Sequence, residues 1–72
     1  MKKDINTIKI GINRRIIDIE KVKELADSLK QIGLINPITI TTNNILVAGQ
    51  HRLEAHKLLG HNEIECNIIL DV

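Results

Sequence analysis

The chain has 72 residues, with ten Lys or Arg against nine Asp or Glu, so its formal net charge is +1, and it contains no Phe, Tyr or Trp. One domain of this size buries only about 60% of the surface that its unfolded chain exposes, so the core must be small and built from Ile and Leu. The near-neutral charge argues against a domain held on DNA mainly by phosphate neutralisation, and the lack of aromatic rings argues against single-stranded nucleic acid bound by base stacking.

The first predicted elements are a strand and a helix. The strand is predicted at residues 5–12, INTIKIGI, where isoleucines alternate with other residues. The helix is predicted at residues 18–33, where apolar residues recur at helical spacing. Asp18 suits its N-cap and Gly33 its C-terminal cap. This helix has the clearest start and stop signals in the chain.

A hairpin is predicted next. Two β-rich runs, residues 35–41 and 44–48, are separated by a short polar stretch. Asn43 and Asn44 tolerate the positive φ angles of a tight turn, so the two runs are expected to pair. Pro37 lacks a backbone N–H and therefore belongs at the start or edge of the first strand.

The chain is predicted to end with a short helix at residues 51–60, closed by Gly60, and a strand at residues 64–70. No repeat or linker interrupts this order, so we expect a single domain over residues 1–72. The predicted fold is α/β (α+β), with a small mixed sheet, two helices and the order β-α-β-β-α-β.

The junction between the hairpin and the second helix is the first candidate site. Where a strand leads through a glycine into a helix, backbone N–H groups and the positive end of the helix dipole face the same point and favour an anion. Gly49 permits close backbone approach, and His51 and Arg52 add donors suited to phosphate. The alternative is an ordinary surface helix start, with Gln50 as a weak cap and Arg52 solvated near Glu54.

A second candidate feature lies on the first helix. Lys21 and Ser28 are seven residues apart, almost two turns, so they share one line of the helix surface, with Glu24 beside it. These residues face either a phosphate and a ribose or only water. Arg14 and Arg15 precede the helix and are candidates for phosphate or DNA contact, the alternative being a solubilising loop pair.

The histidines do not predict a metal site. His51, His56 and His61 recur every five residues, and five residues turn a helix by about 140°, so His51 and His56 do not share a face. We expect His56 on the solvent face. Cys66 is the only cysteine and is expected to be a small buried hydrophobe. The single cysteine, the lack of a signal peptide and the lack of a membrane-length apolar run favour a cytoplasmic protein.

Two motifs carry a resemblance to a known family. LADSLKQIGLINPITI is similar to the ParB pattern of a Leu-rich helix, Ser, Gly-Leu or Gly-Ile, then Pro and a β run. AGQHRLEAHKLLG is similar to the ParB box, Gly-Glu-Arg-Arg followed by an alanine-bearing helix and a glycine. From about residue 8 to residue 70, the chain therefore resembles the ParB N-terminal domain, which shares its fold with sulfiredoxin.

The resemblance implies a nucleotide site that holds CTP or ATP with Mg²⁺. In sulfiredoxin, a Lys and a hydroxyl residue on the first helix form the nucleotide site together with a His-Arg pair, and ParB resembles it in the Gly and Arg of its box. The matching nucleotide-binding positions here are Lys21, Ser28, Gly49, Gln50, His51 and Arg52. Glu24 stands where the family can have a small hydroxyl residue, and its charge is expected to weaken binding. No metal-ligand set is predicted within the chain itself.

The enzymatic activities of the superfamily fit less well. Sulfiredoxin uses a reactive cysteine where this chain has Gln50, and an amide cannot replace that thiolate, so sulfinic acid reduction is rejected. Related free-serine kinases have an aspartate where this chain has Ala48. The alternative hypothesis of a weak NTPase or kinase assigns His51 and Arg52 as the catalytic pair. A ParB-like nuclease would need a carboxylate cluster that the chain does not offer.

The preferred hypothesis is a nucleotide-binding, ParB-like domain of a DNA partition or mobile-element protein. DNA would be contacted through a domain outside this chain, which would then be the N-terminal part of a longer protein, and a homodimer is expected. The contrasting hypothesis is a degenerate scaffold that contacts a protein partner through the edge strands of its small sheet.

Overall fold

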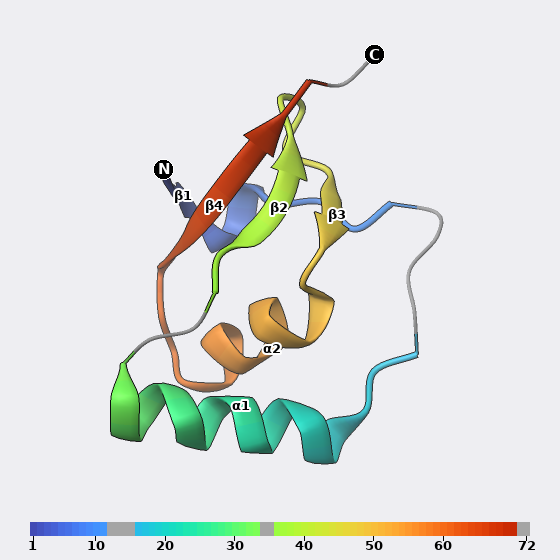
Figure 1. Cartoon of the computed structure of the whole chain (residues 1–72). Helices are drawn as coiled ribbons and strands as arrows, with labels where there is room; N and C mark the ends of the chain where they lie inside the picture. The colour runs from blue at the N-terminus through green and yellow to red at the C-terminus, as the bar shows by residue number, and fades with distance from the viewer. Residues whose placement is uncertain (12–15, 34–35, 71–72) are drawn as a thin grey trace.

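A computed structural model describes residues 1–11, 16–33 and 36–70 of the chain. These residues form a mixed four-stranded sheet and two α-helices, as predicted (Figure 1). The strand order is β1-β4-β2-β3, with β4 antiparallel to β1 and parallel to β2, and β3 antiparallel to β2. In chain order the elements are β1 (Lys2–Asp4), the 3-10 helix η1 (Ile5–Thr7), α1 (Ile19–Ile32), β2 (Ile38–Thr41), β3 (Leu46–Ala48), α2 (Gln50–Leu58) and β4 (Glu63–Ile69).

Helix α2 lies between the sheet and α1 (Figure 1). One of its side chains, Leu53, is fully buried in the cluster that contains Ile38 and Ile40 of β2. Two residues further along, Ala55 is fully buried in a second cluster with Val22 and Ala26 of α1. The small Ala–Ala contact lets the two helices approach closely, so the position of α1 relative to the start of α2 is set by packing on both sides of α2.

The first strand lies earlier than predicted. The chain turns directly after β1, because the Asp4 carboxylate accepts a hydrogen bond from the Asn6 N–H at 2.9 Å and the Thr7 hydroxyl donates to the Asp4 carbonyl at 2.7 Å. Much of the predicted run of alternating isoleucines therefore forms η1 and a short extended segment. Within that run Lys9 makes an isolated parallel bridge to the chain just before β3. Position 12 lies outside the described residues.

Helix α1 begins and ends where its sequence signals predict. The Asp18 side chain accepts hydrogen bonds from the N–H groups of Glu20 and Lys21, at 3.1 and 3.4 Å. Gly33 takes the left-handed conformation, with φ 75°, and its N–H donates to the Leu29 carbonyl. Both ends of the helix are thus fixed by local hydrogen bonds.

The hairpin is confirmed, with one difference in its turn. Strands β2 and β3 pair antiparallel, and Pro37 directly precedes β2. Asn44 has φ 64° and is the one residue other than glycine with positive φ among those described, so Asn43 does not share that conformation. Helix α2 begins at Gln50, one residue earlier than predicted, and Gly60 turns the chain after it with φ 75°.

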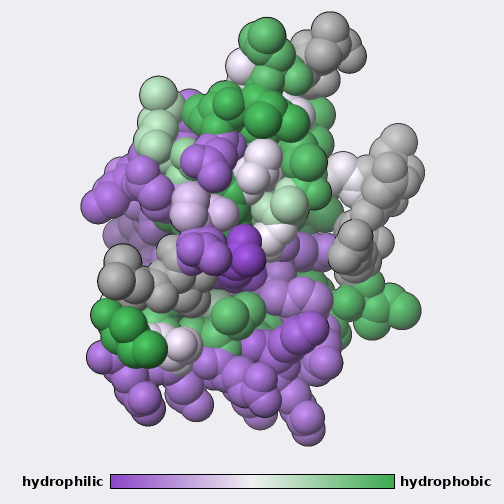
Figure 2. Space-filling model, in the orientation of Figure 1, coloured by the Kyte–Doolittle hydropathy of each residue, from purple (hydrophilic) through white to green (hydrophobic). Residues whose placement is uncertain are grey.

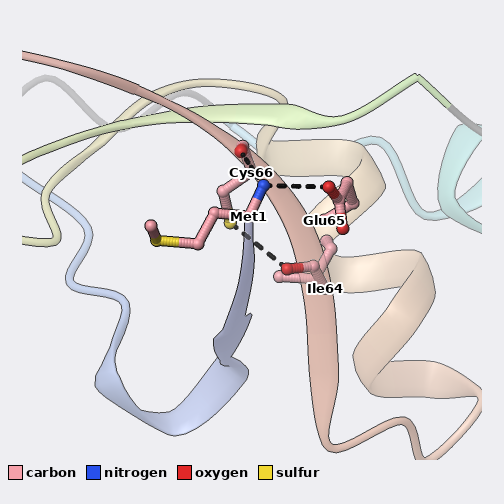
Figure 3. Close-up of polar contacts among 4 residues, drawn as sticks. All are labelled: Met1, Ile64, Glu65 and Cys66. Carbon is pink, nitrogen blue, oxygen red and sulfur yellow. Dashed lines mark hydrogen bonds and ion pairs between the residues drawn. The ribbon is translucent and has the colours of Figure 1, made fainter.

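The N-terminus is tied to β4 (Figure 3). The Met1 ammonium donates to the Glu65 carboxylate at 2.9 Å and to the Cys66 carbonyl at 3.1 Å, while the Cys66 N–H donates to the Met1 carbonyl at 2.8 Å. The Cys66 side chain makes a separate contact within β4, in which its Sγ donates to the Ile64 carbonyl at 3.4 Å. Cys66 is 2% exposed, which confirms it as a buried hydrophobe.

The surface is divided by polarity. In Figure 2 the lower face of the molecule, over α1, is mostly hydrophilic, and the apolar surface gathers over the upper end of the sheet. Ile69 and Leu70 at the end of β4 belong to the exposed apolar residues. In the part of the chain that the structure describes, no helix is long and apolar enough to cross a membrane.

Candidate functional site

A pocket of about 570 Å³ lies between α1 and the start of α2. We call it the α1–α2 pocket. Its walls come from α1, from the end of β3 and from the first turn of α2, so it includes both features that the sequence singled out. The residues that line it are Lys21, Glu24, Leu25, Ser28, Ala48, Gly49, His51 and Arg52.

Gly49 is the N-cap of α2 and lies in the pocket wall. It has φ 101° and ψ 30°, and it makes no side-chain capping hydrogen bond because it has no side chain. A Cβ atom built on Gly49 would lie 2.6 Å from Ile38 Cγ2 and 3.2 Å from Ile38 Cα. Glycine is therefore required both for the backbone angle and for the close approach to β2. The first hydrogen bond of α2 runs from the Leu53 N–H to the Gly49 carbonyl, so the N–H groups of His51 and Arg52 are left for another acceptor.

His51 is held by the first turn of α1. Its Nε2 accepts a hydrogen bond from the Asp18 backbone N–H at 3.1 Å. Nε2 must then be unprotonated, so the neutral imidazole carries its hydrogen on Nδ1, which is the atom left to donate. This contact joins two segments 33 residues apart in the sequence and fixes which side of the ring a ligand would meet.

Arg52 is anchored to the chain ahead of β2. Its Nη1 donates to the Pro37 carbonyl at 3.5 Å, which leaves most of the five guanidinium N–H donors for another acceptor. The alternative interpretation had Arg52 solvated near Glu54. Glu54 instead lies 3.9 Å from the Lys57 ammonium. Arg52 thus faces the pocket rather than its helical neighbour.

The charged side chains of α1 complete the pocket. Lys21, Glu24 and Ser28 all line it, so the helix face on which their spacing placed them meets the pocket rather than water alone. Together with Arg52, the lining contains two permanent cations and one carboxylate. The carboxylate of Glu24 lowers the positive potential of the pocket without cancelling it.

Other predicted residues lie elsewhere. Gln50 is the first residue of α2 but does not line the α1–α2 pocket. Arg14 and Arg15 lie outside the described residues. The prediction that His56 lies on the solvent face is wrong. His56 is partly buried and lines another cavity, together with His61. Its place is set by the chain beyond the helix, which turns back at Gly60 and brings His61 against it.

The sequence analysis also missed two features of the pocket. Leu25 and Ala48 form its apolar walls. From the sequence, Leu25 is only one of the apolar residues that recur at helical spacing on the first helix. The hydrogen bond between Asp18 and His51 had no signal in the sequence, since Asp18 was recognised only as a cap. Among the described residues, no group of three or more His, Cys, Asp or Glu side chains is placed to hold a metal ion.

Comparison with known proteins identifies the family. The family model described as the ParB N-terminal domain matches residues 3–70, nearly the whole chain. This chain belongs to the ParB N-terminal domain family. The domain's relatives include the probable chromosome-partitioning protein ParB of Campylobacter jejuni, which is 48% identical over 54 residues, covering 71% of this chain and 19% of the relative.

The domain is also similar to sulfiredoxin. The chloroplastic/mitochondrial sulfiredoxin of Arabidopsis thaliana is 46% identical over 54 residues, covering 71% of this chain and 43% of that protein. The crystal structure of Arabidopsis sulfiredoxin superposes with a TM-score of 0.86 at 37% identity, covering 99% of this chain and 84% of the other. This chain differs from sulfiredoxin in having no cysteine in the α1–α2 pocket, because its one cysteine, Cys66, is buried in β4.

One solved ParB structure has the same fold. The C-terminally truncated chromosome-partitioning protein ParB of Caulobacter crescentus, complexed with CTP-gamma-S, superposes with a TM-score of 0.84 at 19% identity, covering 100% of this chain and 44% of the other. At this identity the likeness shows the fold alone. The chain spans about a fifth of the length of the first ParB relatives, 19% and 22% in two cases.

Proposed function

We propose that this domain binds the phosphate groups of a nucleoside triphosphate, CTP or ATP with Mg²⁺, in the α1–α2 pocket. The observation that carries the proposal is convergence: Lys21 and Ser28 from α1 and His51 and Arg52 from α2 line one pocket at the N-terminal end of α2. These residues come from two segments more than 20 positions apart in the sequence, and all four offer hydrogen-bond donors.

Each group has a distinct part in the proposal. The first turn of α2 offers the backbone N–H groups of His51 and Arg52 and the positive end of the helix dipole to an oxyanion. Arg52 offers a planar fork of donors, which suits two oxygens of one phosphate. Lys21 supplies a second positive charge, the Nδ1–H of His51 one further donor, and Ser28 a hydroxyl for a phosphate or sugar oxygen.

The pocket favours binding over turnover. Glu24 is the one carboxylate in its described lining. Mg²⁺ is commonly held by one or two carboxylates together with the phosphates of the nucleotide, so Glu24 and a triphosphate would suffice to hold the ion. Among the described lining residues there is no second carboxylate to act as a general base and no thiol for covalent chemistry.

The relatives support a role in DNA partition. They are named chromosome-partitioning proteins, and one structure of the same fold contains a CTP analogue, while a related Caulobacter crescentus structure is complexed to the centromeric parS site. We infer that this domain serves as a nucleotide-binding module of such a protein. DNA would be bound by sequence outside this chain.

Isothermal titration calorimetry tests the proposal, since the chain has no Trp or Tyr for a fluorescence assay. CTP, ATP and GTP are each titrated with Mg²⁺ into the wild type and into Arg52→Ala. Losing a hydrogen bond to a charged group costs about 1.5–3 kcal/mol, so Arg52→Ala should weaken binding roughly 10- to 100-fold. Lys21→Ala should also weaken it, whereas Lys23→Ala, on the same helix but outside the pocket, should not.

A gain-of-binding variant provides the sharper control. Glu24→Gln removes the negative charge from the pocket lining while keeping the side chain's shape, so in EDTA the variant should bind the nucleotide more tightly than the wild type. Loss of folding cannot mimic a gain in affinity. If Glu24→Gln and Lys21→Ala both leave the affinity unchanged, or if no nucleotide produces heat at millimolar concentration, the proposal is wrong and a protein partner becomes the better hypothesis.

A further inference from the structure

A pair of histidines lies at the other end of α2. His56 belongs to the last turn of the helix, and His61 follows the glycine turn that ends it. The His61 N–H donates to the His56 carbonyl at 3.0 Å, which brings the two residues together although they are five positions apart. Their ring centroids are 5.1 Å apart, with the ring planes tilted by 58°.

The two rings meet through their Nδ1 atoms, which are 2.9 Å apart. One Nδ1 must carry the shared hydrogen while the other presents its lone pair, so both atoms already point toward a common region. A tetrahedral Zn²⁺ binds imidazole nitrogen at about 2.0–2.1 Å, which places two such nitrogens roughly 3.3 Å apart. For a cation to replace the shared hydrogen, the pair therefore needs to open by a few tenths of an ångström, and the rings need to turn so that both lone pairs converge on the ion.

Space around the pair also suits a cation. Both histidines line a cavity of about 510 Å³ between α1, β1, β4 and the chain ahead of β2. Its charged lining residues are Lys2, Glu63 and Glu65, and Glu65 is paired with the N-terminal ammonium at 2.9 Å, so carboxylates and ammonium groups balance there. Among the described residues, no third His, Cys, Asp or Glu side chain is placed to join the two histidines on a metal ion.

We propose that His56 and His61 chelate a divalent transition-metal ion of the Zn²⁺, Ni²⁺ or Cu²⁺ class through their Nδ1 atoms. Water fills the remaining coordination positions. Imidazole ligands select these borderline ions over Mg²⁺ and Ca²⁺, which prefer oxygen ligands and require more of them. Since one ligand belongs to α2 and the other to the segment that leads into β4, the ion would clamp the end of the helix to the sheet.

The proposal is tested by titrating the whole chain with ZnCl₂ in a non-chelating buffer near neutral pH, with MgCl₂ as the ionic control. We expect one zinc ion per chain and little response to Mg²⁺. His56→Gln and His61→Gln should each weaken zinc binding by at least about tenfold, because loss of even a supporting metal-site residue costs about 10- to 100-fold. Cys66→Ser removes the buried thiol, the other candidate zinc ligand, and should leave the affinity unchanged.

A second readout separates chelation from a folding defect. Far-UV circular dichroism first shows whether each variant folds, and the thermal midpoint is then measured with and without zinc. A zinc-dependent rise in the midpoint that requires both histidines supports the proposal. Zinc binding that persists in the double variant His56→Gln/His61→Gln, or a folded wild type that takes up no zinc at millimolar concentration, overturns it.

Discussion

Substituting Gly49 by Ala tests whether the close approach of Gly49 to β2 fixes the start of α2, which forms one wall of the α1–α2 pocket. The added Cβ would lie 2.6 Å from Ile38 Cγ2 and 3.0 Å from Ile38 Cβ, both of which belong to a side chain with 0% exposure. Ile38 cannot move away, because β2 pairs with strands on both of its sides. The backbone angle, φ 101°, is also one that alanine rarely adopts.

The expected cost has two parts. The left-handed backbone costs a residue other than glycine about 1–2 kcal/mol, and overpacking a buried site costs about 1–3 kcal/mol more. The sum, about 2–5 kcal/mol, is a large share of the stability of a 72-residue domain, which at about 0.05–0.15 kcal/mol per residue is about 4–11 kcal/mol. We therefore expect Gly49→Ala to lower the urea midpoint strongly. If the wild-type stability lies at the low end of this range, the variant should be partly unfolded even without denaturant.

Gly60→Ala is the matched control. Gly60 also has positive φ, 75°, but a Cβ there would meet nothing within 4 Å. Its cost should be the backbone part alone, about 1–2 kcal/mol. Urea unfolding followed by far-UV circular dichroism measures both variants. If Gly49→Ala is no less stable than Gly60→Ala, the close approach to Ile38 does not constrain the start of α2 and the reasoning is refuted.

Three further predictions concern other residues. Asp18→Ala should lower the free energy of unfolding by about 1 kcal/mol in urea titrations, because the cap of α1 is lost, and Asp18→Asn should restore most of it. The Cys66 thiol, whose pKa is raised chiefly by burial, should react with Ellman's reagent far more slowly in the folded protein than in urea; equal rates would contradict its burial. Burial and then the neighbouring His61 lower the pKa of His56 from its ordinary value of 6.5, so the unfolded chain takes up this proton more readily than the folded one. In EDTA, the contribution of His56 to the free energy of unfolding should be fully present above pH 6.5 and should be lost as the pH falls through the lowered pKa. Urea midpoints measured across this pH range should therefore depend less on pH in His56→Gln than in the wild type. An equal pH dependence in the two proteins would argue against His56 as its origin.

Where local hydrogen bonding decides the structure, the sequence predicted it. The bounds of α1 follow from the Asp18 cap and the Gly33 turn, both of which are encoded within a few residues of the helix ends. The helix stripe of Lys21 and Ser28 was predictable for the same reason, since helical spacing alone aligns the two side chains. The hairpin and the last strand were likewise marked by residue type and alternation.

What depended on distant segments was not predictable. The alternating isoleucines after residue 4 predicted a strand, but the Asp4 side chain caps a 3-10 turn instead. That the stripe on α1 faces the start of α2, rather than water, is decided by the Ala55 contact between the helices and by the hydrogen bond from Asp18 to His51. The His56 side chain was misplaced because helix geometry says nothing of the chain that returns after Gly60.

The most direct test of the central claim is to find where a nucleotide binds. In ¹H–¹⁵N correlation spectra of the labelled domain titrated with CTP and Mg²⁺, the account predicts shifts in the backbone amides of residues 49–52 and along the pocket side of α1. The amides of β1 and of the facing part of β4 should stay in place. Shifts confined to β1 and β4, or none at millimolar CTP or ATP, would contradict the assignment of the α1–α2 pocket as a nucleotide site.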